Sequence, residues 1–394
     1  MTTAPLLPGQ TTDHVSFAQC HISPEARELA LEVMAGGWLT AGQRTLQFEE
    51  ELARWVGART SVAVSSCTAA IEMALRALDL RPGSAVLTPT LTFCGAVNAI
   101  VHAGLRPVLL DVDEQTLTVN ASEVESKRRE RPAAMVVQHM AGYPAATQEL
   151  AEAAGLTLDR VVEDAAHGLG ASRDGRAVGT LPSTTCFSFY ATKNLPIGEG
   201  GALTTPDPER TDRLRVMRQH GMSKDAWRRY EPGAGWRYEV TVDGLKANFT
   251  DLQAAIGLGQ LAHLHTWQAR RAELADRYDA QLGDVPGLVL PPRPSDGRHA
   301  WHLYPIRVQP AFGPCRDELI AALAERGVDT SVHFIPVHRF PYFRQLLGDL
   351  TPSLPVAERV ADQLLSLPLH PHLSDDAVDR VCAQLLSLRT HPRR

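Results

Sequence analysis

The sequence contains very few lysines. Of its 39 basic residues only four are lysines, namely Lys127, Lys193, Lys224 and Lys246, and the remaining 35 are arginines. Wherever a positive charge alone is sufficient, this chain has almost always used arginine. A lysine therefore marks a position at which a primary amine can matter, and Lys193 needs an explanation.

The chain also lacks an excess of positive charge and any long apolar run. Its formal net charge is -6 and it has no long basic stripe, which argues against a general affinity for nucleic acid or anionic membranes. No stretch approaches the roughly 20 apolar residues of a membrane span, and the N-terminal segment lacks the features of a signal peptide. We therefore predict a cytoplasmic protein that binds neither nucleic acid nor membranes.

The cysteines form no CxxC pair. In a reducing compartment, scattered cysteines are predicted to be buried small apolar residues rather than a disulfide framework or a zinc site. His333 and His338 lie five positions apart around Pro336, but no third acidic or cysteine ligand stands at a suitable spacing, so we predict no metal site. The cysteines are residues 20, 67, 94, 186, 315 and 382.

From residue 61 to about residue 205, short apolar runs rich in β-branched residues alternate with helical patterns. This alternation predicts an α/β fold with a largely parallel sheet that is covered by helices on both faces. Ligands usually bind at the ends of such strands. The predicted strands are SVAVSS, SAVLTPT, RPVLLDVD, AAMVVQHM, RVVEDA, TTCFSFY and GALTT, and the helices between them include TAAIEMALRALDL, GAVNAIVHAGL and TQELAEAAGL.

The last third of the chain predicts a smaller α+β domain. One long helical pattern begins near Thr250 and continues to Leu282, and DELIAALAERG and AVDRVCAQLLSL are typical of further helices. We predict an N-terminal segment with a large domain over residues 1–265 and a small C-terminal domain over residues 266–394.

Lys193 stands in the stretch FSFYATKNLPIGEGG, between an apolar, aromatic run and a glycine-rich turn. A primary amine can form a Schiff base with an aldehyde, which a guanidinium group cannot do. The glycines at 198, 200 and 201 fit a turn whose backbone passes close to something bulky. The alternative is an ordinary surface lysine after a strand.

Two other stretches favour a cofactor site. Asp164 in VVEDAAHG follows a buried-type strand, where an isolated carboxylate is costly unless it meets a cation, such as the protonated ring nitrogen of pyridoxal 5'-phosphate (PLP). In AVSSCTAAIEMAL a strand runs through Ser66, Cys67 and Thr68 into a helix, which presents N–H groups and hydroxyls to an anion. The alternatives are a strand-end turn at Asp164 and an ordinary helix N-cap.

The chain as a whole resembles the DegT/DnrJ/EryC1/StrS family of PLP-dependent sugar aminotransferases. The most specific match is the stretch around Lys193, which is similar to the family signature F-S-F-x-A-T-K-N-x-x-x-G-E-G-G. The resemblance implies fold type I, the aspartate aminotransferase fold, with a mostly parallel seven-stranded sheet sandwiched by helices and a smaller C-terminal domain. It also implies that Lys193 carries PLP as a Schiff base, that Ser188 contacts the cofactor phosphate, and that pyridoxamine 5'-phosphate (PMP) is the intermediate form.

The resemblance implies further cofactor contacts on either side of the predicted strand SAVLTPT. The stretch SSCTAA is similar to the phosphate-binding turn of the family, which implies Thr68 and the backbone at Cys67 and Ala69 as ligands. Many relatives carry glycine at the position of Cys67. In TPTLTFCGAVNAI, Phe93 matches the aromatic residue that stacks on the pyridine ring.

Two more positions, and the oligomeric state, follow from the same resemblance. Asp164 matches the residue that pairs with the ring nitrogen, and His167 falls where relatives often carry glutamine beside the cofactor. The stretch DGLKANFTDLQAA resembles G-Y-K-Y-N-M-T-D-I-Q-A-A, whose asparagine, here Asn248, reaches the cofactor phosphate of the neighbouring subunit. Leu245 and Ala247 replace the usual tyrosines. A homodimer with shared active sites is therefore implied.

The implied reaction moves an amino group from an amino acid, by resemblance glutamate, to a nucleotide-linked ketosugar, with Lys193 and Asp164 as the catalytic residues. Stretches KANFTD and HFIPVH look like those of C4-specific relatives, so we hypothesise a 4-keto-6-deoxyhexose. The alternatives are an inosose (cyclitol) or 3-ketosugar aminotransferase and a non-catalytic PLP-binding regulatory protein. The sugar dehydratase branch of the family carries histidine at the position of Lys193, so this lysine argues against that activity. Residues that match substrate-side positions are His220, Lys246, His333 and His338.

Overall fold

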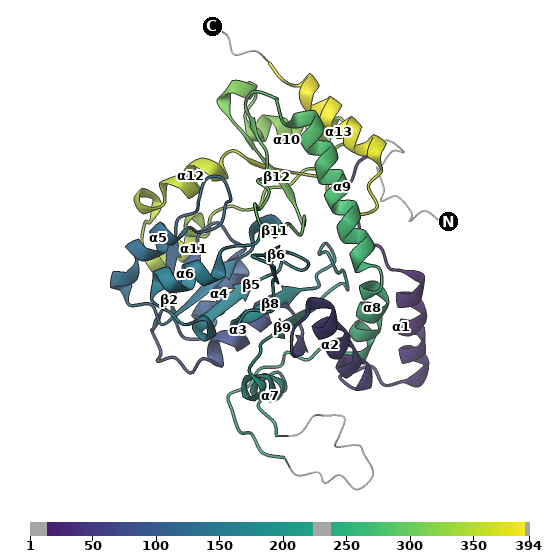
Figure 1. Cartoon of the computed structure of the whole chain (residues 1–394), viewed down its shortest axis with the longest axis vertical. Helices are drawn as coiled ribbons and strands as arrows, with labels where there is room; N and C mark the ends of the chain where they lie inside the picture. Colours follow the sequence, from purple (N-terminus) through teal and green to yellow (C-terminus); the bar gives the residue numbers. More distant parts are fainter. Residues whose placement is uncertain (1–13, 224–237, 391–394) are drawn as a thin grey trace.

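A seven-stranded sheet forms the centre of the computed structural model, which describes residues 14–223 and 238–390 (Figure 1). Only β9 runs against its neighbours, because it pairs antiparallel with β8 and β1, whereas the other four pairings are parallel. All seven predicted strands are present, so the predicted fold class is confirmed. In spatial order the strands are β1 (Ser61–Val64), β9 (Gly201–Thr204), β8 (Thr184–Ser188), β5 (Val161–Asp164), β4 (Ala134–Gln138), β2 (Ala85–Pro89) and β3 (Arg106–Leu110).

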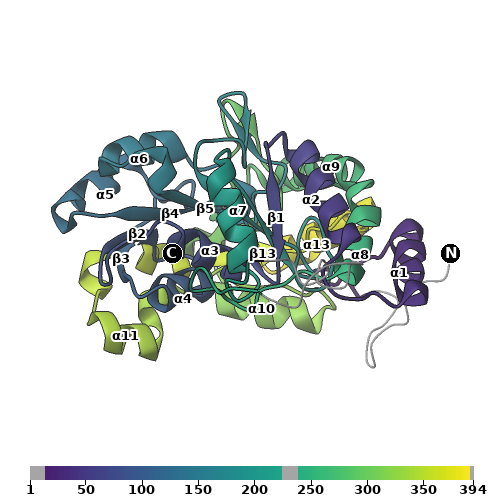
Figure 2. The same ribbon diagram turned by 90° about the horizontal axis from the view of Figure 1, so that it is seen from below.

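Helices cover both faces of this sheet (Figure 2). In β4, Val136 packs into the core below one face while Val137 packs into the core on the other, because successive side chains of a strand point to opposite sides. The strands are therefore continuous apolar runs rather than alternating ones. One face is covered by α3 (Cys67–Arg76), α4 (Cys94–His102) and α7 (Pro208–Met217), and the other by α2 (Gln43–Val56), α5 (Ala121–Ser126) and α6 (Thr147–Ala154).

A buried carboxylate fixes the end of β5 next to Asp164. Glu163 is 1% exposed and accepts hydrogen bonds from His139 Nε2 at 3.0 Å, Thr147 Oγ1 at 3.0 Å, Thr185 Oγ1 at 2.8 Å and the Ser183 hydroxyl. Burial alone would raise the pKa of Glu163, but these donors hold it below its usual value. The strand end that presents Asp164 is thus locked by polar contacts.

A second, three-stranded antiparallel sheet occupies the upper part of Figure 1. Its core includes the stacked rings of Tyr278 and Tyr304, whose centroids lie 4.7 Å apart. The predicted domain boundary after residue 265 falls in the first turn of α9, and it stays a prediction. The elements here are β10 (Leu288–Val289), β12 (Tyr304–Val308), β13 (Leu364–Leu367), α9 (Leu264–Leu282), α10 (Arg316–Glu325) and α13 (Asp375–Ser387).

Polar contacts fasten the later part of the chain to the large sheet. The Asp111 carboxylate accepts hydrogen bonds from the backbone N–H groups of Val356, at 2.9 Å, and Ala357, at 2.7 Å, at the start of α12 (Pro355–Ala361). Glu114 pairs with Arg307 at 2.7 Å. The remaining elements are α11 (Pro341–Leu347) and a small sheet of β11 (Gly297–Arg298), β6 (Ser172–Arg173) and β7 (Arg176–Ala177).

The predicted long helix from Thr250 to Leu282 is wrong in one respect. The structure has two helices, α8 (Asp251–Leu261) and α9, separated at Ala262 and His263. The His263 N–H group bonds to the Gln260 carbonyl three residues back, which tightens the turn there. Neither residue is a helix breaker, so nothing in the sequence signals this interruption.

The prediction that all the cysteines are buried is also wrong in part. Cys67, Cys186 and Cys382 are buried, but Cys20 and Cys315 are exposed. Cys315 is the N-cap residue of α10, a surface position, and Cys20 lies on the N-terminal segment before α1 (Pro24–Gly36).

A glycine lets α1 pack directly on α8. A Cβ atom added at Gly259 would lie 2.3 Å from the backbone nitrogen of Ala26 and 2.4 Å from its Cα atom. Ser23 strengthens this contact, because its backbone N–H group donates to Gln260 Oε1 at 3.0 Å. The two helices therefore approach more closely than any side chain at residue 259 would allow.

We predict that Gly259→Ala lowers the free energy of unfolding by about 2 kcal/mol, because the new methyl group must push the backbone of α1 away. Thermal and denaturant unfolding of the purified protein measure this change. Gly36→Ala is the matched control, since a Cβ atom at Gly36 meets nothing within 4 Å. Equal stability of the two variants would contradict the packing described.

Candidate active site

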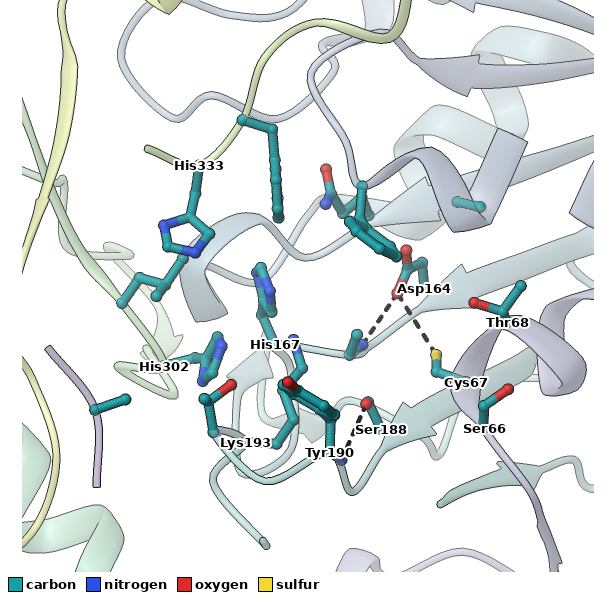
Figure 3. A pocket seen from close by; sticks show the side chains of 18 of the residues that line it. Ser66, Cys67, Thr68, Asp164, His167, Ser188, Tyr190, Lys193, His302 and His333 are labelled. Atoms are coloured by element: carbon teal, nitrogen blue, oxygen red, sulfur yellow. Dashed lines mark hydrogen bonds between the residues drawn. The ribbon is translucent and has the colours of Figure 1, made fainter. Parts of the chain in front are cut away.

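A cavity of about 530 Å³ lies at the carboxyl ends of the central strands. Its floor is formed by the ends of β4, β5 and β8 together with the start of α3, and its other wall by residues from the later part of the chain (Figure 3). The end of a parallel sheet is where α/β proteins usually bind ligands.

Lys193 lies in the turn after β8, and its side chain lines the cavity. Burial lowers the pKa of its amine from 10.5 to about 8, although the charge of Asp164 partly opposes the change. About one tenth of the amine is then unprotonated at neutral pH, against about one part in 3,000 for an ordinary lysine. Within residues 14–223 and 238–390 the amine has no hydrogen-bond partner. A nucleophilic amine therefore faces the cavity.

Asp164 is the last residue of β5 and is only 5% exposed. Burial raises the pKa of its carboxyl group, while the Ala166 N–H group, which donates to Oδ1 at 3.1 Å, and the charge of Lys193 oppose the rise. The thiol of Cys67 lies 3.8 Å from the same oxygen. In the described part of the chain no basic nitrogen lies within 4.0 Å of this carboxylate. The site therefore fits a ligand that brings a protonated nitrogen.

Hydroxyls and a helix N-terminus gather in the part of the cavity next to Asp164. The side chain of Ser66 caps α3 by accepting a hydrogen bond from the Ala69 N–H group at 3.1 Å. Ser66, Cys67 and Thr68 line the cavity at this helix start, and Ser188 lines it at the end of β8. Free N–H groups and hydroxyls at the start of a helix are suited to a phosphate.

The glycine-rich turn after Lys193 is crowded by the protein itself. A Cβ atom at Gly201 would lie 2.5 Å from the carbonyl carbon of Ser66 and 2.6 Å from the nitrogen of Cys67. At Gly200 it would lie 2.7 Å from the ring of Phe249. The sequence predicted that the backbone of this turn passes close to something bulky. In the structure that neighbour is the backbone of Ser66 and Cys67 together with the ring of Phe249.

Phe93 is not a core residue. It is 58% exposed, lines the cavity, and lies with its ring centroid 6.3 Å from that of Phe334. An exposed aromatic ring at a cavity wall is available to stack on a flat ligand.

Three histidines form the wall near Lys193 (Figure 3). The rings of His167 and His302 lie 4.3 Å apart between centroids, and His333 bonds through Nδ1 to the hydroxyl of Ser366 at 2.9 Å. Burial lowers the pKa of His167 and of His302 well below 6.5, and that of His333 to about 4. All three are neutral at physiological pH.

Several predicted site residues lie outside this cavity. His338 is buried and bonds through its two ring nitrogens to Thr90 Oγ1 and Glu358, both at 2.7 Å, so both nitrogens are already occupied. Lys246 Nζ donates to Asn248 Oδ1 at 2.8 Å on a segment that pairs with β1. The cavity lining also lacks Ala69 and His220.

Several residues that line the cavity were not predicted from the sequence. His302 stands in AWHLYP, a segment that the sequence marked only as part of the smaller domain. Its place in the site depends on a contact between parts of the chain that are more than 100 residues apart. The other unpredicted lining residues with polar side chains are Gln138, Tyr190, Thr192 and Glu199.

The chemistry of the residues present fits PLP. Lys193 supplies an amine for its aldehyde, Asp164 supplies a buried carboxylate for its ring nitrogen, and Phe93 supplies a flat face. The start of α3 supplies a phosphate site. The structure, as far as it describes the chain, holds no group of three or more His, Cys, Asp or Glu side chains placed to bind a metal ion. It contains no helix that is both long and apolar enough to cross a membrane, within the same residues.

Comparison with known proteins agrees with this chemistry. The model of the DegT/DnrJ/EryC1/StrS aminotransferase family matches residues 21–386. The spore coat polysaccharide biosynthesis protein SpsC of Bacillus subtilis is 45% identical over 363 residues, which are 91% of this chain and 92% of SpsC. The crystal structure of the aminotransferase TlmJ from Streptoalloteichus hindustanus matches with a TM-score of 0.86 at 36% identity, covering 95% of this chain and 98% of TlmJ.

Solved structures also bear on the cofactor and the substrate class. Spr1654 from Streptococcus pneumoniae has been solved in its PLP-form and its PMP-form, which match this chain with TM-scores of 0.86 and 0.87 at 26% and 27% identity. Both cover 95% of this chain and 98% of that protein, and other matching structures are of sugar aminotransferases. The chain therefore belongs to the DegT/DnrJ/EryC1/StrS family and is a PLP-dependent sugar aminotransferase.

Proposed function

We propose that this enzyme transfers the amino group of glutamate to C4 of a nucleotide-linked 4-keto-6-deoxyhexose. The observation that carries the amino-transfer chemistry is the amine of Lys193, whose pKa is lowered to about 8, and the buried carboxylate of Asp164, which line one cavity. The choice of C4 and of glutamate rests on the KANFTD and HFIPVH stretches and on the family resemblance. A relative named for polysaccharide biosynthesis supports a carbohydrate product.

In the proposed reaction Lys193 has two tasks. It attaches the cofactor through its amine, and once displaced it moves a proton from the α-carbon of the amino donor. When bound, PLP supplies an aldehyde that condenses with amines and a ring that withdraws electrons from the reacting carbon. A pKa of about 8 suits Lys193 to both tasks, because the amine can give and take a proton near neutral pH.

The other residues of the cavity hold and polarise the cofactor in this proposal. Asp164 keeps the ring nitrogen protonated, and it can do so because that cation offsets the cost of its burial. Phe93 packs on the ring, and His167 lies beside it. The phosphate is held by Thr68, Ser188 and the backbone at Cys67, and His333 is on the substrate side. Ala69 is left out, since its N–H group already donates to Ser66 and it does not line the cavity. His338 is left out, since its ring nitrogens are already bonded.

We further propose a homodimer whose active sites are shared. Asn248 and Lys246 lie outside the cavity of their own chain, which is expected if Asn248 serves the cofactor phosphate of the partner. Apolar side chains that are exposed in the single chain are available to such a contact. They include Leu31, Met34, Trp38, Leu39, Tyr238 and Val240.

We predict that the purified enzyme converts a nucleotide-linked 4-keto-6-deoxyhexose to the 4-amino sugar when glutamate is supplied, as measured by mass spectrometry of the product. Lys193→Arg keeps the charge but cannot form a Schiff base, so we expect its rate to fall by at least about 1,000-fold. Amination of an inosose or a 3-ketosugar with no product from any 4-ketosugar would contradict the proposed substrate.

We predict that two inactive variants restore activity when their subunits are mixed. Half of the dimers formed from Lys193→Ala and Asn248→Ala chains contain one chain of each kind, and each such dimer has one site with both residues intact. The mixture should therefore regain about a quarter of the wild-type rate after subunit exchange.

The control for subunit mixing is a pair of variants whose residues belong to the same chain's site. Lys193→Ala mixed with Asp164→Asn leaves both sites of every dimer damaged, so this mixture should stay inactive. Recovery in neither mixture, with exchange verified by native mass spectrometry, would show that Asn248 does not act across the dimer.

A further inference from the structure

His302 is held rigidly in the cavity wall by the segment to which it belongs. Its backbone N–H group donates to the Ala141 carbonyl at 3.0 Å, and the neighbouring Ala300 N–H group donates to the Gly142 carbonyl at 2.8 Å. From the other side, the buried guanidinium of Arg271 donates to the carbonyls of Trp301 at 3.2 Å and His302 at 3.4 Å. A ring on so fixed a backbone can present one nitrogen in a constant direction.

Asn194, which follows Lys193 directly, sets the tautomer of this ring. The carbonyl of Ala300 can only accept, so the Asn194 amide nitrogen, 2.8 Å away, must donate to it. The amide oxygen of Asn194 therefore faces His302 Nδ1, at 3.1 Å, and that nitrogen must carry the proton. Neutral His302 is consequently protonated at Nδ1 and has a free lone pair at Nε2.

The Nε2 atom of His302 is a hydrogen-bond acceptor that has no donor in the described part of the chain. Within residues 14–223 and 238–390 the ring forms a hydrogen bond only through Nδ1, and the side chain lines the cavity. The ring stays neutral because burial lowers the pKa of His302 well below 6.5, and the positive charges of Lys193 and Arg271 lower it further. The lone pair on Nε2 of this neutral ring can therefore accept a hydrogen bond from an N–H or O–H donor in the cavity.

Lys193 can supply this donor. It is the one lysine or arginine among the described residues of the cavity wall, and its amine likewise has no partner there. Figure 3 shows Lys193 and His302 together on the side of the cavity away from Thr68. The flexible stem of a lysine lets its amine turn toward the ring. His167 cannot serve as this acceptor through Nδ1, which already accepts from the Ala141 N–H group at 3.2 Å.

We propose that His302 is a positioning residue whose Nε2 atom accepts a hydrogen bond from the Lys193 amine whenever that amine is not bound to the cofactor, with Asn194 fixing the required tautomer. This inference rests on the proposed role of Lys193 but on no particular sugar or amino donor. It gives the displaced lysine a defined hydrogen-bond partner in the cavity wall.

The test is the pKa of the Lys193 amine in the full-length protein loaded with PMP. The rate of Lys193 carbamoylation by cyanate, followed by peptide mass spectrometry across pH, reports this pKa. The groups that act on the amine besides His302 are Asp164 from β5, Cys67 from α3, His167 and His333, and none of them is changed in the variants.

Two matched variants separate the two nitrogens of His302. In His302→Asn the amide nitrogen can replace Nδ1 and keep the bond to Asn194, but nothing remains at Nε2. In His302→Gln the amide oxygen can reach the position of Nε2. Because a hydrogen bond to the ammonium form raises its pKa, we expect His302→Asn to lower the pKa of Lys193 by roughly one unit, and His302→Gln to stay near the wild-type value.

Asn194→Ala is expected to lower the pKa of Lys193 as well, because the tautomer is no longer fixed. Variants with an unchanged thermal midpoint are compared, so that loss of structure is not mistaken for the effect. A wild-type pKa in His302→Asn, or an equal fall in His302→Gln, would overturn the proposal. Loading with PMP needs neither sugar nor donor, so failure of the amination assay and failure of this titration are separate outcomes.

Discussion

The site depends on the electrostatic interaction between Lys193 and Asp164, which line the same cavity. Removal from water disfavours the charged form of each group, so the pKa of the lysine falls to about 8 and that of the aspartate rises. Each charge also opposes the shift of the other. The result is an amine that is partly free and a carboxylate that gains from a new cation, which together match the two ends of PLP.

The fold supplies this arrangement through the ends of neighbouring strands. Asp164 ends β5, Ser188 ends β8, and Lys193 follows in the next turn, so the register of a parallel sheet brings all three to one edge. Glu163 and its four donors hold the end of β5 in place. The far wall comes from the later part of the chain, where His302 is fastened to the 141–142 turn and to Arg271.

The sequence predicted the sheet because its strands are buried on both faces and therefore stand out as short apolar runs. It predicted the motif residues at Lys193, Asp164 and Thr68 because each belongs to a local pattern of strand end, turn and helix start. The break between α8 and α9 and the exposure of Cys315 carried no such signal, since alanine, histidine and cysteine are compatible with either outcome. His302 was not singled out, and His338 was predicted on the substrate side although its ring nitrogens bond to Thr90 and Glu358, because the surroundings of both histidines come from residues distant in the chain.

The most direct test of the central claim is to locate the covalent bond between protein and cofactor. The protein carrying PLP is reduced with borohydride, digested, and mapped by mass spectrometry. The chain offers only four lysines, so the map has few possible outcomes. The account predicts the label on the peptide that contains Lys193 and its absence from Lys193→Arg. A label on the peptide of Lys127, Lys224 or Lys246, or no label despite abundant bound PLP, would contradict it.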